Sequence, residues 1–167
     1  FTMYQLMVAS KSDLEIVFQL IEQRIEWMNR VGIKQWNETN YCEVYPKTYY
    51  ERLMRQGRLY VLKSNQTHRV IGAVACFDQD ERWCDTKEVS AYYLHHLVTD
   101  YREKGVGHIL LKEIEGVARK HKKHCLRLDC AMDNERLNQY YEEQGFLWCG
   151  QCEEGLYRGN LREKTLG

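Results

Sequence analysis

A short run of residues near position 105 has the composition of a phosphate-binding turn. Arg102-x-x-Gly105-x-Gly107 lies where a strand-like segment, Ser90 to Val98, gives way to a helical pattern that runs from Gly105 to His121. Glycine lets a ligand approach the backbone closely, and the unpaired N–H groups of a helix's first turn favour an anion because the positive end of the dipole lies behind them. We therefore predict that this turn binds phosphate.

Two better-known nucleotide motifs are missing from the chain. The dinucleotide fingerprint G-x-G-x-x-G fails because position 110 is leucine, and no G-x-x-x-x-G-K-[ST] sequence occurs. A plain helix start can also use permissive glycines, so the turn alone does not decide between a ligand site and a structural cap.

A second segment follows roughly 30 residues later and favours the ligand site. The strand-like run Leu126 to Cys130 leads to Asn134, then to Tyr141 seven residues on, and then to Gly145-Phe146. Together the two segments resemble the two signature motifs of the GNAT superfamily of acetyl-CoA-dependent N-acetyltransferases. The resemblance is strong over about half of the chain, residues 90 to 150. Two departures, Glu103 for glycine and Leu137 for alanine, are tolerable, although the carboxylate of Glu103 would lie near a diphosphate.

The resemblance implies a site for acetyl-CoA. The diphosphate would lie over the turn, which comprises Arg102, Glu103, Lys104, Gly105, Val106, Gly107 and His108. The strand ending at Leu97, Val98 and Thr99 would splay from the strand 125–130, so that the pantetheine arm pairs with its free edge, beside Asn134 and Leu137. A backbone N–H of Leu97 or Val98 would stabilise the oxyanion of the tetrahedral intermediate.

Two kinds of proton transfer are required. Tyr141 matches the family tyrosine near the cofactor sulfur, which makes it the candidate acid for the leaving thiolate, while Tyr140 is expected to face the core. The acceptor amine, with a pKa near 10, must lose a proton before it attacks. His95 and His96 are candidate bases, and alternation along a strand predicts that only one points into the cleft. Glu88 is a third candidate, and a buried structural role is an alternative for each histidine.

The acceptor site in this family is built by the first two helices, their connecting loop and later strands. In this chain those segments are rich in aromatic residues, namely Trp27, Trp36, Tyr41, Tyr45, Tyr49 and Tyr50. Aromatic rings bind apolar chains or cations, and Glu38, Glu43 or Glu88 could pair with an amine. We expect a small amine or an amino-acid-like acceptor. For the aromatic residues the alternative is an ordinary edge of the core. For the function the alternatives are a protein or peptide acceptor and a silent acyl-CoA-binding regulatory module.

The elements that position these residues form a mixed α/β, α+β-like pattern. An amphipathic helix is predicted from a capping box at Ser12 and Glu15 to Val31-Gly32, residues 33–45 as a loop, and a short helix from Pro46 to about Arg55. Strands at 59–62, 70–77 and 90–98 then form a meander, followed by helix, strand, helix and a final strand pair. We predict the GNAT fold, with one mostly antiparallel sheet of about six or seven strands, helices on both faces and a splayed cofactor cleft.

The composition bounds the remaining possibilities. A chain of 167 residues suits one domain, residues 1–167. Lysine plus arginine equal aspartate plus glutamate at 24 each, so the net charge does not favour a nucleic acid or a membrane as partner. We expect a cytoplasmic protein, and a homodimer is compatible with the sequence.

Seven cysteines are expected to be reduced, because they lie mostly in apolar strand-like runs. Cys149 and Cys152 have the spacing of a metal or redox pair, but residues i and i+3 of a strand face opposite sides. We therefore predict no metal.

Overall fold

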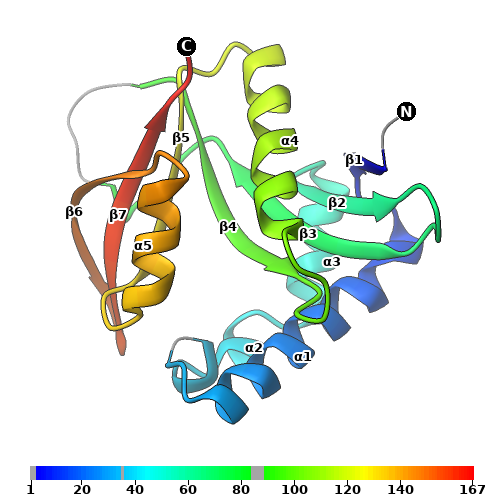
Figure 1. The fold of residues 1–167 in the computed structure, drawn as a ribbon, viewed down its shortest axis with the longest axis horizontal. Helices are drawn as coiled ribbons and strands as arrows, with labels where there is room; N and C mark the ends of the chain where they lie inside the picture. Colours follow the sequence, from blue (N-terminus) through cyan, green and yellow to red (C-terminus); the bar gives the residue numbers. More distant parts are fainter. Residues whose placement is uncertain (1–2, 35, 84–88) are drawn as a thin grey trace.

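Seven strands form one open sheet in the computed structural model, which describes residues 3–34, 36–83 and 89–167 (Figure 1). The spatial order is β1-β2-β3-β4-β5-β7-β6. The strands are β1 (Tyr4–Val8), β2 (Leu59–Ser64), β3 (Val70–Phe77), β4 (Ala91–Thr99), β5 (Cys125–Ala131), β6 (Leu147–Glu154) and β7 (Tyr157–Thr165). Neighbouring strands pair antiparallel except β4 and β5, which are parallel. The predicted fold class is confirmed.

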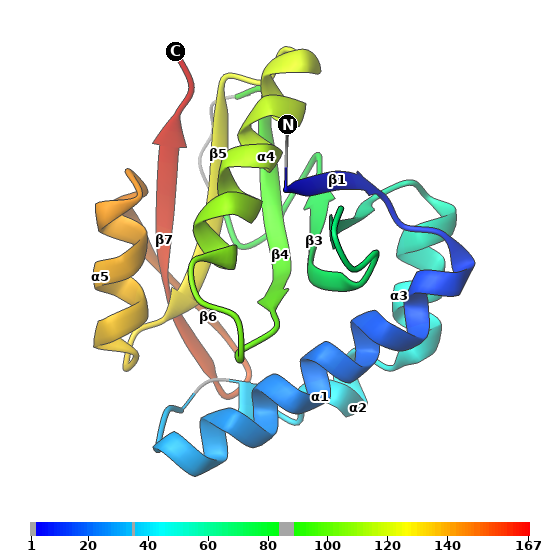
Figure 2. The ribbon, with the colours of Figure 1, turned by 45° about the vertical axis from the view of Figure 1, so that its right-hand side comes forward.

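Helices cover both faces of the sheet (Figures 1 and 2). The helices α4 (Val106–Lys120) and α5 (Glu135–Glu143) pack on one face, and α1 (Leu14–Val31) and α3 (Lys47–Arg55) pack on the other. Neighbouring residues of β2 illustrate the division, since Val61 faces the core under α1 and Leu62 faces the core under α4. Strands buried on both faces read as continuous apolar runs, as 59–62 and 70–76 do.

The first helix begins differently from the prediction. The expected capping pair was Ser12 and Glu15, but the backbone N–H of Ser10 donates to Oδ2 of Asp13 at 2.9 Å, and a 3₁₀ turn (Lys11–Asp13) precedes α1. Asp13 is the better partner because it is buried, and Lys63 of β2 forms an ion pair with it at 3.1 Å. The predicted end is confirmed, with Gly32 in the left-handed region at φ +77°.

The segment predicted as a loop, residues 33–45, contains a 3₁₀ turn (Trp36–Glu38) and the one-turn helix α2 (Tyr41–Val44). Both elements are too short to show a helical period in the sequence. The ring of Trp36 stacks on that of Tyr41, with centroids 4.4 Å apart. Ring packing therefore orders this segment more than backbone propensity does.

The parallel neighbours β4 and β5 pair only at their beginnings. Among the described residues the register runs from Ala91 opposite Cys125 to Tyr93 opposite Arg127, and then stops. β5 continues to pair with β7 as far as Ala131, so the two strands diverge from Leu94 onward (Figure 1). The edge of β4 that faces this split therefore keeps backbone N–H and C=O groups without a strand partner. This is the predicted splay.

Candidate active site

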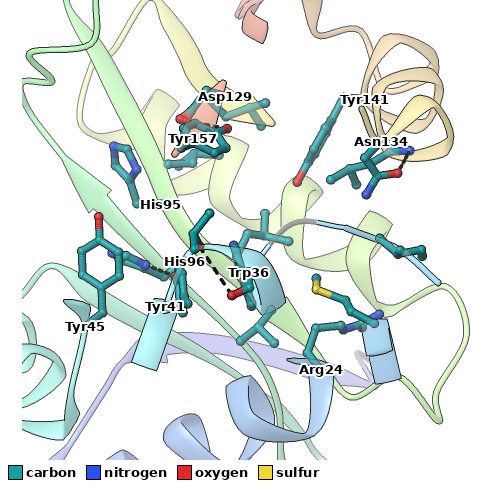
Figure 3. A pocket seen from close by; sticks show the side chains of 18 of the residues that line it. Arg24, Trp36, Tyr41, Tyr45, His95, His96, Asp129, Asn134, Tyr141 and Tyr157 are labelled. Carbon is teal, nitrogen blue, oxygen red and sulfur yellow. Dashed lines mark hydrogen bonds between the residues drawn. The ribbon is translucent and has the colours of Figure 1, made fainter. Parts of the chain in front are cut away.

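A cavity of about 590 Å³ opens where β4 and β5 separate (Figure 3). Its wall is formed by both strands, the end of α1, the segment 33–45, the starts of α4 and α5, and the β6–β7 turn. The predicted site residues that line it are Trp27, Trp36, Tyr41, His95, His96, Leu97, Val98, Thr99, Gly107, Asn134, Leu137 and Tyr141. Residues that are far apart in the sequence thus meet in one chamber.

Other predicted residues lie outside the cavity wall. Within the described part of the chain these are Arg102, Glu103, Lys104, Gly105, Val106 and His108 of the turn, and Glu38, Glu43, Tyr49 and Tyr50 of the acceptor group. Glu88 lies outside the described residues.

The predicted phosphate turn lies at the start of α4, beside the cavity. Gly105 occupies the N-cap position with φ +80°, a conformation that L side chains rarely adopt. Gly107 lines the cavity, and a Cβ at this position would lie 3.1 Å from the hydroxyl of Tyr140. One glycine is thus required by backbone conformation, and the other allows a close approach.

Arg102, the first residue of the turn, folds back onto Asp100. Its Nε and Nη2 atoms lie 2.9 and 2.8 Å from the two carboxylate oxygens, and its backbone N–H donates to Oδ1 at 3.0 Å. Asp100 is only 2% exposed, and the hydrogen bond from Arg102 holds the pKa of its carboxyl below the usual value. Asp100 therefore fixes the path of the chain into the turn.

A bulge in β4 brings both histidines to the cavity. Ala73 of β3 faces Val98 and Ala75 faces His95, so one residue of β3 lies opposite two residues of β4, His96 and Leu97. His96 has φ +57°, which is uncommon for a residue other than glycine. Because the extra residue interrupts the alternation of side chains, the expectation that only one histidine faces the cleft is wrong.

His96 is buried, and both of its ring nitrogens are engaged. Nδ1 forms a hydrogen bond with the hydroxyl of Tyr41, and Nε2 lies 2.9 Å from the hydroxyl of Tyr49. The rings of Tyr45 and Tyr50 also pack against it, with centroids 4.5 and 5.5 Å away. Burial lowers the pKa of His96 well below its ordinary value, so this imidazole is neutral and tied to α2 and α3.

His95 has a different environment, because its Nε2 atom lies 2.7 Å from Oδ2 of Asp80. Burial alone would raise the pKa of Asp80, but the hydrogen bond from His95 holds it below the ordinary value. A neutral His95 that donates from Nε2 keeps its lone pair on Nδ1, which is free to take a proton. The Asp80–His95 pair therefore has the chemistry of an oriented base.

An ion network that runs from the buried side chain of Asp129 to the exposed Glu154 lies beside this pair. Arg82 donates from Nη1 to both carboxylate oxygens of Asp129, at 2.9 and 3.1 Å, and from Nε to Glu154 at 2.7 Å. Burial raises the pKa of Asp129, and the charge of Arg82 opposes that rise. With Asp80, three carboxylates face one guanidinium, which leaves this end of the cavity net negative whenever His95 is neutral.

Tyr141 is 7% exposed, and Figure 3 shows its hydroxyl directed into the cavity. Burial raises its pKa, so the phenol carries its proton at neutral pH. Tyr140 was expected to face the core, but it is half-buried and also lines the cavity. Its place next to Gly107 explains the difference, since the glycine leaves room for its ring.

Asn134 caps α5, because its side-chain oxygen accepts a hydrogen bond from the backbone N–H of Leu137 at 3.0 Å. The capping role considered for this residue is therefore confirmed. Asn134 also lines the cavity, so the cap is compatible with contact to a ligand.

Six charged residues of the site were not predicted: Arg24, Asp80, Arg82, Asp129, Arg136 and Glu154. Asp129 carried a usable signal, because it is a carboxylate in a strand whose other residues, apart from Arg127, are apolar, and such a group is buried only with a partner. Arg24 carried none, because it is one of many polar residues on an amphipathic helix. Asp80 and Arg82 lie in an irregular loop that has no sequence period.

Metal and membrane features are reported for the described residues only. Among them, no group of three or more histidine, cysteine, aspartate or glutamate side chains could hold a metal ion. Six cysteines are unpaired, and Cys149 is exposed whereas Cys152 is buried, as expected for opposite faces of a strand; Cys84 is not described. No helix in this part of the chain is long and apolar enough to cross a membrane.

Comparison with known proteins identifies the family. The model of the Acetyltransferase (GNAT) family matches residues 27–146. The uncharacterized N-acetyltransferase YesJ of Bacillus subtilis (strain 168) is 24% identical over 151 residues, which are 87% of this chain and 82% of the relative. A GNAT-family acetyltransferase from Listeria monocytogenes 4b F2365 superposes with a TM-score of 0.81 at 21% identity, over 99% of both chains. PaiA N-acetyltransferase from Thermoplasma acidophilum, solved in complex with coenzyme A, has a TM-score of 0.75 at 19% identity, over 99% of this chain and 100% of that one.

The residues at the split suit the same cofactor. They provide an unpaired strand edge, a glycine-capped helix start and a cavity between them. Acetyl-CoA is the acyl donor of this family, and the chain belongs to the GNAT acetyltransferases.

Proposed function

We propose that the protein transfers the acetyl group of acetyl-CoA to the primary amine of a small molecule. One observation carries the proposal: the protonated hydroxyl of Tyr141 faces a cavity whose opposite wall is the unpaired edge of β4. A binding module that performs no chemistry needs the cavity but not a buried acid directed into it.

The donor half of the site uses backbone groups. The free edge of β4 beyond Tyr93 pairs with the amides of the pantetheine arm, and the N–H of Leu97 or Val98 takes the oxyanion. The first turn of α4, after the left-handed Gly105, holds the diphosphate. Asn134 and Leu137 line the cavity at the start of α5 and would contact the arm there.

The transfer needs one proton removed and one supplied. The acceptor arrives as an ammonium ion, so it first loses one proton to solvent and becomes a neutral amine. As its nitrogen then forms the new C–N bond, a second proton passes to Nδ1 of His95, directly or through water, and Asp80 stabilises the resulting imidazolium. As the C–S bond breaks, Tyr141 gives its proton to the thiolate. Solvent returns the proton from His95 to Tyr141, so an amine and acetyl-CoA yield an amide and the free thiol.

His95 is assigned as the base in preference to His96. Both nitrogens of His96 are hydrogen-bonded to tyrosine hydroxyls, which leaves no lone pair for an incoming amine. Within the described residues His95 is hydrogen-bonded at one nitrogen only, and it lies next to the net negative end of the cavity, where an ammonium group is favoured.

The acceptor end favours a small amine. Trp36, Tyr41 and Tyr45 form an aromatic wall, which suits an apolar body or a cation. A cavity of about 590 Å³ that also contains the acetylated end of pantetheine leaves room for a compact acceptor. The need for acetyl-CoA and for reduced cysteines favours the cytoplasm.

A screen of primary amines with acetyl-CoA, with released thiol as readout, tests the function. We expect at least one amine to release thiol stoichiometrically with its N-acetyl product, and the Tyr141→Phe variant to lose that turnover. If acetyl-CoA binds but neither small amines nor peptide N-termini release thiol, the chain is a silent binding module and the proposal is wrong. Turnover of peptides alone would make it a protein acetyltransferase.

A further inference from the structure

Arg24 of α1 is a cation in the cavity wall that the donor chemistry does not use. Its Nη2 atom donates to the backbone oxygen of Thr99 at 2.8 Å and to the hydroxyl of the same residue at 2.9 Å. Its guanidinium also lies 4.8 Å from the centroid of the Trp27 ring. These hydrogen bonds and the ring contact hold the guanidinium in place. The group is also partly buried.

The charge of Arg24 is not balanced locally. No carboxylate of the described residues lies within 4.0 Å of it, whereas Arg82, at the other end of the cavity, contacts both Asp129 and Glu154. Arg136 is a second cavity arginine without such a partner among those residues, but it is exposed to water. A partly desolvated guanidinium with unused N–H donors is ready to bind a planar anion.

Burial acts on this group as expected for an unpaired cation. Desolvation lowers the pKa of Arg24, and the charge of Asp100 only partly opposes that effect. Asp100 is already engaged by Arg102 and, at 3.5 Å, by Arg69. An anionic ligand would remove the desolvation penalty that the protein itself leaves uncompensated.

We propose that Arg24 binds a carboxylate of the acceptor, so that the enzyme acetylates amines that also carry an acid group, such as amino acids. This inference rests on the proposed N-acetyltransferase function. Thr99, which positions Arg24, lies two residues beyond Leu97 and one beyond Val98. Because a strand advances about 3.3 Å per residue, the anion site lies roughly 3 to 7 Å along β4 from the proposed oxyanion donor. An acid group a few bonds from the reacting amine spans that distance.

The charge distribution along the cavity agrees with such an acceptor. Arg24 supplies a cation at the α1 end, while Asp80, Asp129 and Glu154 outnumber Arg82 at the other end. The carboxylate and the amine of one molecule are therefore drawn to opposite ends of the cavity, with the thioester carbon between them. Figure 3 shows Arg24 and Asp129 on opposite sides of the chamber.

Matched pairs of amines test this subsite. Suitable pairs are L-phenylalanine and phenethylamine, L-tryptophan and tryptamine, L-arginine and agmatine, L-lysine and cadaverine, and 4-aminobutyrate and butylamine. In the wild-type enzyme we expect kcat/KM to be at least tenfold higher for the acid than for its partner in any pair that is turned over. Arg24→Gln should lower kcat/KM roughly ten- to hundredfold for the acid only, because a charge-assisted hydrogen bond is lost.

Two further variants make the test specific. Arg30→Gln removes the same charge from an exposed position on the same helix and should leave the preference unchanged. Arg24→Lys keeps the positive charge but not the planar fork, so it should retain part of the preference for the acid. This variant keeps the test valid if Arg24→Gln disturbs Thr99. The melting temperature and the KM for acetyl-CoA should stay close to wild type in all three variants.

The outcomes separate this proposal from the one on which it rests. If amines without an acid group are better substrates, or if Arg24→Gln slows both members of a pair equally, the carboxylate subsite is wrong and the acetyltransferase function stands. A raised KM for acetyl-CoA in Arg24→Gln would place the anion on the cofactor instead. If no amine of either class releases thiol, both proposals are wrong.

Discussion

The two halves of β4 differ in how many neighbouring strands they pair with. Residues 91–93 pair with β3 and β5, and both Ala91 and Tyr93 are buried. Residues 94–99 pair with β3 alone, contain a bulge with a left-handed His96, and line the cavity. One strand thus changes from a fully bonded support to a half-bonded binding edge within a few residues.

The bonded half is held by side chains as well as by the ladder. Arg127 of β5, which is 4% exposed, donates to the hydroxyl of Tyr93 at 2.8 Å and to Glu163 of β7 at 2.7 Å. Beyond this point no comparable contact joins the two strands in the described residues. Where side chains tie the strands together the sheet is structural, and where they do not, a ligand can complete the ladder.

The largest expected effect comes from the turn that follows the unpaired half. Gly105→Val puts a β-branched residue at φ +80°, which distorts the N-terminus of α4. We expect affinity for coenzyme A to fall roughly a hundredfold or more in calorimetric titration, with the circular dichroism spectrum preserved. Gly116→Ala, an exposed position in the same helix with open space around it, is the control and should bind normally. Unchanged affinity in Gly105→Val would show that the diphosphate lies elsewhere.

Loss of the acid should be the next largest effect. Tyr141→Phe keeps the ring that packs on Phe146 and removes only the hydroxyl, so we expect kcat to fall about 10²- to 10⁴-fold while affinity for acetyl-CoA and the melting temperature stay the same. Steady-state kinetics with an identified acceptor measures the loss. A parallel loss of stability would point to a packing role, and a wild-type rate would exclude the hydroxyl as the essential acid.

The buried His96 at the bulge should make the free energy of unfolding depend on pH. Burial depresses the pKa of His96, so below about pH 6.5 the unfolded state binds a proton that the folded state does not. The free energy of unfolding should therefore fall with acidity, by up to about 1.4 kcal/mol per pH unit from this group. Urea titrations between pH 5 and 7 should show a shallower dependence in His96→Gln.

That pH window separates the histidine from the carboxylates whose pKa is lowered, and Asp129, whose pKa is raised by burial, is present in both proteins, so its contribution cancels in the comparison. The pKa values of Asp13, Asp80 and Asp100 are lowered from an ordinary value of 3.8, so their contributions are lost only at more acidic pH. An identical slope in wild type and His96→Gln would mean that His96 is protonated in the folded protein, which contradicts its buried, doubly bonded environment.

A substitution in the β6–β7 hairpin should have the smallest effect on binding and turnover, because pairing there continues through the β6 bulge. Cys149 is exposed, so Cys149→Ser should change the melting temperature, cofactor affinity and turnover within experimental error. Thiol titration of the denatured wild-type protein should find seven free cysteines, the number in the sequence. One bound zinc per chain by elemental analysis, lost in Cys149→Ser, would overturn this expectation.

Much of the fold could be predicted because apolar runs and turn residues specify it locally. The continuous apolar runs 59–62 and 70–77 and the helical period after Gly105 can be recognised from the local sequence alone. The segment 33–45 could not be predicted in the same way, because its order comes from ring contacts such as that of Trp36 with Tyr41. Capping was predicted two residues too late, since the choice of Asp13 depends on Lys63 in a distant strand.

The motif spacing correctly led to residues that line the cavity, such as Gly107 and Tyr141, whereas residues that depend on contacts between distant segments were missed. The turn and Tyr141 have fixed spacings, whereas the bulge at His96 depends on the register between β3 and β4 and left no trace in the sequence. The rule that side chains alternate along a strand therefore failed at the bulge, where both His95 and His96 line the cavity. The partners of His95 and Asp129 come from an irregular loop, which only the folded chain brings close.

Hydrogen exchange of the backbone amides with and without coenzyme A tests the central claim most directly. If the pantetheine arm completes the ladder at the split, peptides covering residues 94–99 and 102–108 should become protected on binding, while residues 91–93, already bonded on both sides, should not change. Binding of coenzyme A without protection of residues 94–99 would contradict the account, because the cofactor would then lie outside the gap between β4 and β5.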